Sequence, residues 1–106
     1  MVSNKYGARK TVCRHEHWHD SMREANRCVD LHVLQQGGAI TDLAFQVSFD
    51  LVVNDVKICR YVADFTYWDE RDHKAIVEDC KGMRTAIYQL KKKLMKACRG
   101  IEIRES

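Results

Sequence analysis

The sequence predicts a single α/β domain in which a mixed central sheet is flanked by two helices. Three observations predict this fold. Residues 21–36 and 83–98 carry the apolar spacing of amphipathic helices. The segments between them alternate with period two, as strands do, and a short alternating stretch follows the second helix. The resulting order (a strand, a helix, three strands, a helix and a last strand) contains an αβββαβ core.

Size and composition fit one soluble domain. The chain has 106 residues, of which 45% are hydrophobic and 31% charged. No apolar run approaches the ~20 residues of a membrane span, and the start has no signal-peptide core, so we expect a cytoplasmic protein with no membrane contact. The five cysteines form no CxxC pair, which favours reduced thiols.

Positive charge is concentrated near the end of the chain. Residues 81–99 carry seven Lys or Arg and no Asp or Glu, whereas the remainder carries eleven basic against fifteen acidic residues. Such segregation is typical of a protein that binds a polyanion on one side.

Residues 1–10 are polar and basic, and we interpret them as a flexible arm that precedes a domain over 11–106. The basic residues of this arm either contact nucleic acid or belong to a frayed terminus, and the sequence favours neither interpretation over the other. They are Lys5, Arg9 and Lys10.

Residues 11–18 read as one strand that places Cys13, His15, His17 and His19 on one face. Four ligands along one extended strand do not readily close a tetrahedron, so zinc is disfavoured, and a solvated or DNA-facing strand is preferred.

The first helix begins at Asp20 or Ser21 and ends at Gly37 and Gly38. Ser21 and Glu24 fit a capping box, which explains Glu24 structurally. The alternative is a functional carboxylate. It is favoured because Glu24 shares a stripe with the apolar residues Cys28 and Leu31.

Residues 39–53 form the next predicted strand, followed by a turn at Asn54 and Asp55. In the strand after that turn, apolar residues share one face and leave Asp64 on the other; they are Cys59, Tyr61, Ala63, Phe65 and Tyr67. Gln46 lies on the polar face of residues 39–53, where it either orients a water or is merely exposed.

The charged residues 69–73 form a loop before the third strand of the group. There Asp79 and Lys81 point the same way, whereas Glu78 points oppositely and is interpreted as structural. A paired sheet would bring two carboxylates and one ammonium to a single spot. Metal-assisted phosphodiester hydrolysis needs this combination, since oxygen ligands hold a divalent ion and a cation stabilises developing charge.

The last helix is predicted over 83–98, ended by Gly100, with an edge strand at 101–104. Its predicted core stripe is Met83, Ile87, Leu90, Leu94, Ala97 and Cys98. The opposite face is polar and basic, with Thr85, Gln89, Lys92, Lys96 and Arg99. No acid lies at i±4 to neutralise this charge, so the face is predicted to bind phosphates.

Asp64 followed by Asp79-Cys80-Lys81 resembles the D…(D/E)xK signature of the PD-(D/E)XK nuclease superfamily, with Ala63 at the Pro position. The chain more closely resembles a small phage and prophage family of uncharacterised endonucleases within it. The matching residues are Lys5-Tyr6-Gly7, Asp20-Ser21, Glu24-Ala25, Asp64-Phe65, Glu78 to Gly82, Thr85, Tyr88, Lys91 and Leu94.

Residues and resemblance together predict a Mg²⁺-dependent endodeoxyribonuclease, with Mn²⁺ as an alternative metal. The expected metal ligands are Asp64, Asp79, the main-chain carbonyl of Cys80 and, directly or through water, Glu24. Lys81 would position the nucleophile. The expected DNA contacts are Lys5, Arg9, Lys10, Arg84, Thr85, Gln89, Lys91, Lys92, Lys96 and Arg99.

No base-reading element is evident, so we expect recognition of DNA shape, as in a Holliday junction resolvase, by a homodimer in a bacterial host. Two alternatives stay open. One is a non-catalytic nucleic-acid-binding module on the same fold. The other is a nuclease whose metal is held by His15, His17 and His19.

Overall fold

The computed structural model of the chain describes residues 11–12, 18–19, 22–80 and 84–106. Its elements are β1 (Thr11–Val12), β2 (Trp18–His19), α1 (Met22–Gln36), β3 (Ile40–Val53), β4 (Val56–Asp69), β5 (Lys74–Asp79), α2 (Ala86–Arg99) and β6 (Arg104–Glu105). The main sheet has the order β3-β4-β5-β6. β3, β4 and β5 are antiparallel, and β6 is parallel to β5 because α2 connects them. The prediction of an α/β fold with a mixed sheet and two helices is confirmed.

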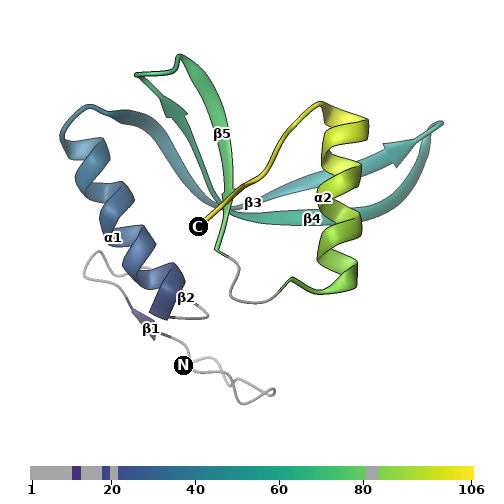
Figure 1. Cartoon of the computed structure of the whole chain (residues 1–106), viewed down its shortest axis with the longest axis horizontal. Coiled ribbons are helices and arrows are strands. Elements are labelled where there is room, and N and C mark those ends of the chain that lie inside the picture. Colours follow the sequence, from purple (N-terminus) through teal and green to yellow (C-terminus); the bar gives the residue numbers. More distant parts are fainter. Residues whose placement is uncertain (1–10, 13–17, 20–21, 81–83) are drawn as a thin grey trace.

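The long β3–β4 hairpin is the main body of the sheet, and its tip extends past α2 (Figure 1). Asn54 and Asp55 form its turn with φ of 50° and 66°, as a two-residue hairpin requires. Along β4, Tyr61, Ala63 and Phe65 are buried and the residues between them are more exposed. The predicted alternation of this strand is therefore confirmed.

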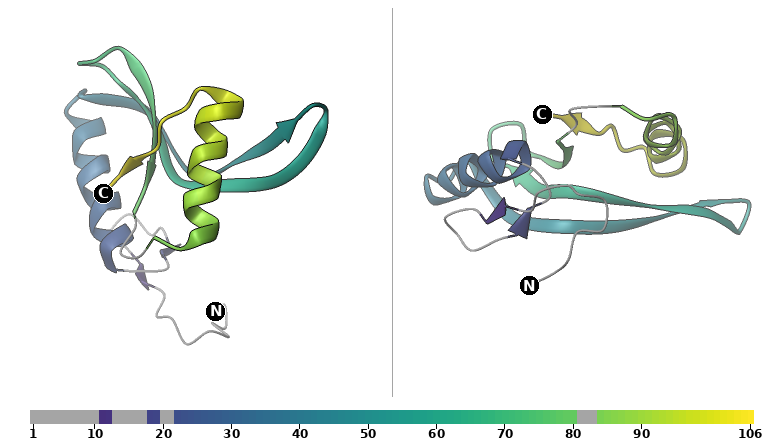
Figure 2. Two further views of the ribbon diagram at one scale, coloured as in Figure 1. Left: turned by 45° about the vertical axis from the view of Figure 1, so that its right-hand side comes forward. Right: turned by 90° about the horizontal axis from the view of Figure 1, so that it is seen from below.

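Each helix covers its own part of the core, and the two lie on either side of β5 and β6 (Figures 1 and 2). The cluster under α1 consists of Ala25, Cys28, Leu31, Ile40, Phe65, Tyr67 and Ile76. The cluster under α2 consists of Leu51, Tyr61, Ala63, Val77, Tyr88, Met95 and Ile103. Because β4 contributes to both clusters, it joins the two halves of the core. Neither described helix is long and apolar enough to cross a membrane.

α1 ends where the sequence predicts. Gly38 has a φ of 81°, which an L side chain rarely adopts, and the Ala39 N–H donates to the Leu34 carbonyl 2.9 Å away. Glu24, Cys28 and Leu31 are all buried, so the predicted stripe is confirmed. The two candidate capping residues, Asp20 and Ser21, lie outside the described residues.

α2 is rotated relative to the prediction. It begins after Thr85, whose hydroxyl accepts a hydrogen bond from the Tyr88 N–H at 3.1 Å. Ile87 and Leu90 were expected in the core but are 68% and 56% exposed, whereas Tyr88 and Met95 are buried. The predicted stripe is wrong at Ile87 and Leu90, where the large Tyr88 ring packs inward instead and its hydroxyl reaches Glu105, whereas Leu94 packs against the core as predicted.

Both ends of the domain differ from the predicted strands. Thr11 pairs with His19 and Val12 with Trp18, so the chain reverses between β1 and β2 and residues 11–18 are not one strand. Cys13, His15 and His17 lie outside the described residues, as do Lys5, Arg9 and Lys10. β6 is later than the predicted 101–104, but it is an edge strand, as expected.

Candidate active site

Three acidic side chains from three elements meet where β4 and β5 separate. Phe65 and Glu78 are the last paired residues of these strands, so Asp64 and Asp79 come next and lie on the opposite face. The Asp64 carboxyl group interacts with both Glu24 of α1 and Asp79 of β5. The structure therefore brings together the three acids that the sequence singles out.

Hydrogen bonds from neighbouring groups fix the orientation of these acids. The Tyr61 hydroxyl donates to Asp79 Oδ2 at 2.5 Å, and the Cys80 N–H donates to Asp64 Oδ2 at 2.8 Å. Glu24 and Asp79 are only 5% and 1% exposed. The cluster is therefore held in place by the fold, as a preorganised site requires.

The cluster is electrostatically unfavourable at neutral pH. Burial and the neighbouring Glu24 raise the pKa of Asp64 to about 6, from an ordinary 3.8. Asp79 and the Cys80 N–H act in the other direction but do not outweigh these effects. A cation bound between the carboxylates would remove this repulsion.

The available donors are hard oxygen atoms, the kind that Mg²⁺ prefers. They come from Asp64, Asp79 and Glu24 and, after β5, from the carbonyl of Cys80. In the arrangement that the structure shows, no group of three or more His, Cys, Asp and Glu among the described residues could hold a metal ion. Lys81 lies outside the described residues.

Glu78 occupies a different environment on the other face of β5. It is fully buried and accepts hydrogen bonds from Arg27 Nε at 2.6 Å, from the Tyr67 hydroxyl at 2.5 Å and from Ser106 Oγ at 2.8 Å. Burial alone would raise its pKa, but these hydrogen bonds, led by the one from Arg27, hold the pKa below its usual range. Glu78 therefore serves as the centre of a structural network, as its position in the strand indicates.

Gln46 lies across the hairpin from the cluster. Phe45 pairs with Phe65 and Val47 with Ala63, which puts Gln46 opposite Asp64. Its φ of 52° is unusual for a strand residue, and its side chain is exposed. Both of the roles considered for it, orienting a water or plain exposure, fit this position.

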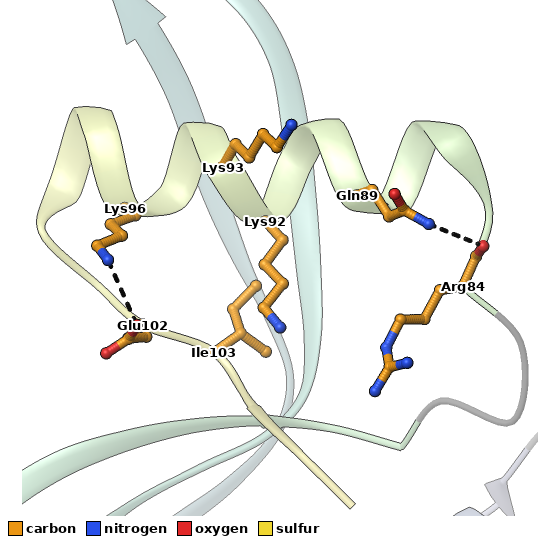
Figure 3. Close-up of a pocket in the computed structure, with 7 residues that line it drawn as sticks. All are labelled: Arg84, Gln89, Lys92, Lys93, Lys96, Glu102 and Ile103. Atoms are coloured by element: carbon orange, nitrogen blue, oxygen red, sulfur yellow. Dashed lines mark hydrogen bonds and ion pairs between the residues drawn. The ribbon is translucent and has the colours of Figure 1, made fainter.

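The basic side of α2 faces the C-terminal segment across a groove of about 400 Å³ (Figure 3). Glu105 accepts hydrogen bonds from Arg84 Nε at 2.7 Å and Lys92 Nζ at 3.1 Å. These partners and Tyr88 lower the pKa of Glu105 to about 2. Lys96 forms an ion pair with Glu102. α2 itself carries no acid that could pair with its cations at i±4. Glu102 and Glu105 of the C-terminal segment pair with them instead.

The remaining candidate DNA contacts differ in their availability. Thr85 caps α2, and Gln89 donates to the Arg84 carbonyl at 3.3 Å. Arg99 donates to the Asp50 carbonyl at 2.9 and 3.1 Å and lies over the Phe49 ring. Among the described residues, Lys91 takes part in no ion pair.

Sequence reasoning missed the residues that orient the acids. Tyr61 and Tyr67 were placed on the apolar face of β4, but their hydroxyl groups reach Asp79 and Glu78. Buried tyrosines usually find a hydrogen-bond partner, so this pattern was a usable signal. Arg27 binds Glu78 and Glu105 binds Arg84, and both pairs are too far apart in the sequence for a local pattern to reveal them.

A family profile of uncharacterised proteins, DUF1064 (protein of unknown function), matches residues 3–104. The chain therefore belongs to this family. No curated protein and no solved structure matches it significantly.

Proposed function

We propose that this protein is a Mg²⁺-dependent endodeoxyribonuclease, with Mn²⁺ as an alternative metal. The observation that carries the proposal is the meeting of Glu24, Asp64 and Asp79 in one largely buried cluster, where the pKa of Asp64 is raised to about 6. Sites that concentrate like charges in this way are typical of catalytic or metal-binding centres.

Each residue of the cluster has a distinct role in the proposal. Asp64 and Asp79 would hold the metal together with the Cys80 carbonyl, and Glu24 would complete the site directly or through water; the side chains would have to close around the ion, since their present arrangement does not form a metal site. A bound Mg²⁺ would polarise the scissile phosphate and lower the pKa of a water molecule. Tyr61 holds Asp79 in place through its hydroxyl. The role of Lys81, to position the nucleophile, rests on the sequence motif.

DNA would be held through its phosphates by the basic side of α2, and its shape rather than its sequence would be recognised. A branched junction is the substrate we consider first. A homodimer would supply the two sites needed to cut both strands, in the cytoplasm of a phage's bacterial host.

Cleavage of three DNAs tests this function: a linear duplex, a single strand and a four-way junction, each with Mg²⁺, with Mn²⁺ and with EDTA. Cleavage that requires the metal is the expected result. DNA binding without cleavage in either metal would contradict the enzyme and leave the non-catalytic module as the function.

Asp64→Asn should stabilise the metal-free protein by about 1–2 kcal/mol at about pH 8. The folded-state pKa of Asp64, about 6, lies above its ordinary 3.8, so the wild type loses stability as the pH rises through this interval. Asn carries no charge and avoids this loss, while its side-chain oxygen can still accept from the Cys80 N–H. Thermal unfolding in EDTA at about pH 8 and about pH 4 measures the difference, which should disappear at the lower pH.

Mg²⁺ provides the control for this experiment. It should raise the melting temperature of the wild type and have a smaller effect on Asp64→Asn, because the variant lacks one charged ligand. A variant that is less stable than the wild type at about pH 8 would show that the cluster is not repulsive.

Glu105→Gln should strengthen DNA binding about 3- to 10-fold at low salt and steepen its salt dependence. The substitution removes the charge that pairs with Arg84 and Lys92, which leaves both cations for phosphates. Fluorescence anisotropy over a salt series measures this effect. Glu102→Gln is the graded comparison: the exposed Glu102 pairs with one cation, Lys96, among the described residues, so its substitution should strengthen binding less. Weaker binding by Glu105→Gln would show that Glu105 instead orients the cations.

A further inference from the structure

A second groove, of about 290 Å³, lies beside the acidic cluster. It runs between β4 and the first half of α2, and its lining residues are Arg60, Tyr61, Val62, Thr85, Ile87, Tyr88 and Lys91. The groove adjoins the cluster because Tyr61, one of its lining residues, donates its hydroxyl hydrogen bond to Asp79. A ligand in this groove would therefore lie next to the proposed site of hydrolysis.

One exposed aliphatic side chain lies on each side of the groove. Val62 of β4 is 42% exposed and Ile87 of α2 is 68% exposed, although each lies in a regular element that has a buried side. Two aliphatic side chains that face each other across one groove offer an apolar contact to a ligand that enters it. A flat apolar group, such as a nucleobase, fits between two aliphatic walls.

The same groove carries two available cations. Arg60 and Lys91 take part in no ion pair among the described residues, in contrast to Arg84, Lys92 and Lys96 on the other side of α2. Apolar walls with unpaired cations complement a nucleotide, which has an apolar base face and charged phosphates. A hydrophobic peptide would leave both cations without a partner.

We propose that this groove binds one unpaired nucleotide of the DNA, with its base between Val62 and Ile87 and its neighbouring phosphates at Arg60 and Lys91. The inference deepens the proposed function and rests on it, because it places this nucleotide beside the bond that is cleaved. In a fully paired duplex a base must first be unstacked and unpaired, and this energetic cost disfavours its entry into the groove. The groove therefore selects DNA that has an unpaired nucleotide, as branched DNA can.

Binding of two DNAs by fluorescence anisotropy in EDTA tests this inference without requiring cleavage. One is a fully paired duplex, and the other is the same duplex with a single unpaired thymidine. Ile87→Ser should weaken binding of the second DNA about 5- to 10-fold and leave binding of the first unchanged. Leu90→Ser is the matched control, because Leu90 is exposed on the same helix but does not line the groove. It should change neither.

The cations give a second comparison. Arg60→Gln should weaken binding of both DNAs and make the salt dependence shallower, because it removes a phosphate contact. Lys74→Gln is its control, because Lys74 is exposed at the start of β5 and lines neither this groove nor the one beside the C-terminal segment. Circular dichroism of all four variants confirms that they fold.

The outcomes separate this inference from the nuclease proposal. Suppose that Ile87→Ser and Leu90→Ser bind each DNA with the same affinity while the wild type cuts DNA in Mg²⁺. The proposed nucleotide groove is then excluded and the nuclease proposal stands. If Ile87→Ser selectively weakens the unpaired DNA while the wild type cuts nothing, the nucleotide groove stands and the nuclease is overturned. A wild type that binds neither DNA overturns both.

Discussion

Asp79→Asn should reduce the rate of metal-dependent DNA cleavage by about 10³-fold or more. Asp79 is nearly completely buried between Asp64 and the Tyr61 hydroxyl, so its carboxylate has a fixed position in the proposed metal site. Asn preserves the shape and can still accept the hydrogen bond from Tyr61, so the substitution removes mainly the charge. Single-turnover cleavage rates and the metal-free melting temperature, measured together, separate a chemical effect from unfolding.

Tyr61→Phe provides the graded comparison. It leaves all three carboxylates in place and removes only the hydroxyl that orients Asp79, so a loss of about 10-fold in cleavage rate is expected. Asp79→Asn that retains more than a tenth of the wild-type rate would show that Asp79 is not a metal ligand, whatever the effect of Tyr61→Phe.

Glu78→Ala should lower the free energy of unfolding by about 3–5 kcal/mol. Glu78 is fully buried and accepts two hydrogen bonds from Arg27, one from Tyr67 and one from Ser106. Removing it leaves the partly buried Arg27 guanidinium without its partner and the Tyr67 hydroxyl without its acceptor. Urea unfolding monitored by tryptophan fluorescence measures the change.

Two controls bear on this second prediction. Glu78→Gln keeps the volume and some of the hydrogen bonds, so it should cost less than Glu78→Ala. The pKa of Glu78 is held below its ordinary 4.5, so this stabilisation is present above that pH in the wild type and is lost as the pH falls through the folded-state pKa. A Glu78→Ala protein as stable as the wild type would mean that the network with Arg27 does not stabilise the fold.

The adjacent residues Glu78 and Asp79 thus have opposite expected effects, one on stability and one on catalysis. They differ because successive side chains of a strand point to opposite faces. Glu78 meets Arg27, which compensates its charge, whereas Asp79 meets Asp64, a second acid. The structure thus bears out the opposite orientations predicted for Glu78 and Asp79.

The sequence by itself determined the two helices, the three strands between them, the hairpin turn and the buried side of α1 and β4. These features depend on periodicity, caps and turn residues, which act over a few neighbouring positions. The hairpin turn at Asn54 and Asp55 and the end of α1 at Gly38 are examples. The meeting of Asp64 and Asp79 could be anticipated as well, because a paired sheet brings together side chains that point to the same face of adjacent strands.

Only the tertiary structure decided the rotation of α2, the reversal between β1 and β2, and the partners of the charged residues. Tyr88 turns inward because its ring fills the core and its hydroxyl reaches Glu105, 17 positions later. Glu105 likewise neutralises Arg84 across 21 positions, and Tyr61 orients Asp79 across 18. Contacts of this kind depend on how whole elements pack, since hydrogen bonds and ion pairs act over a few ångströms in space whatever the separation along the chain.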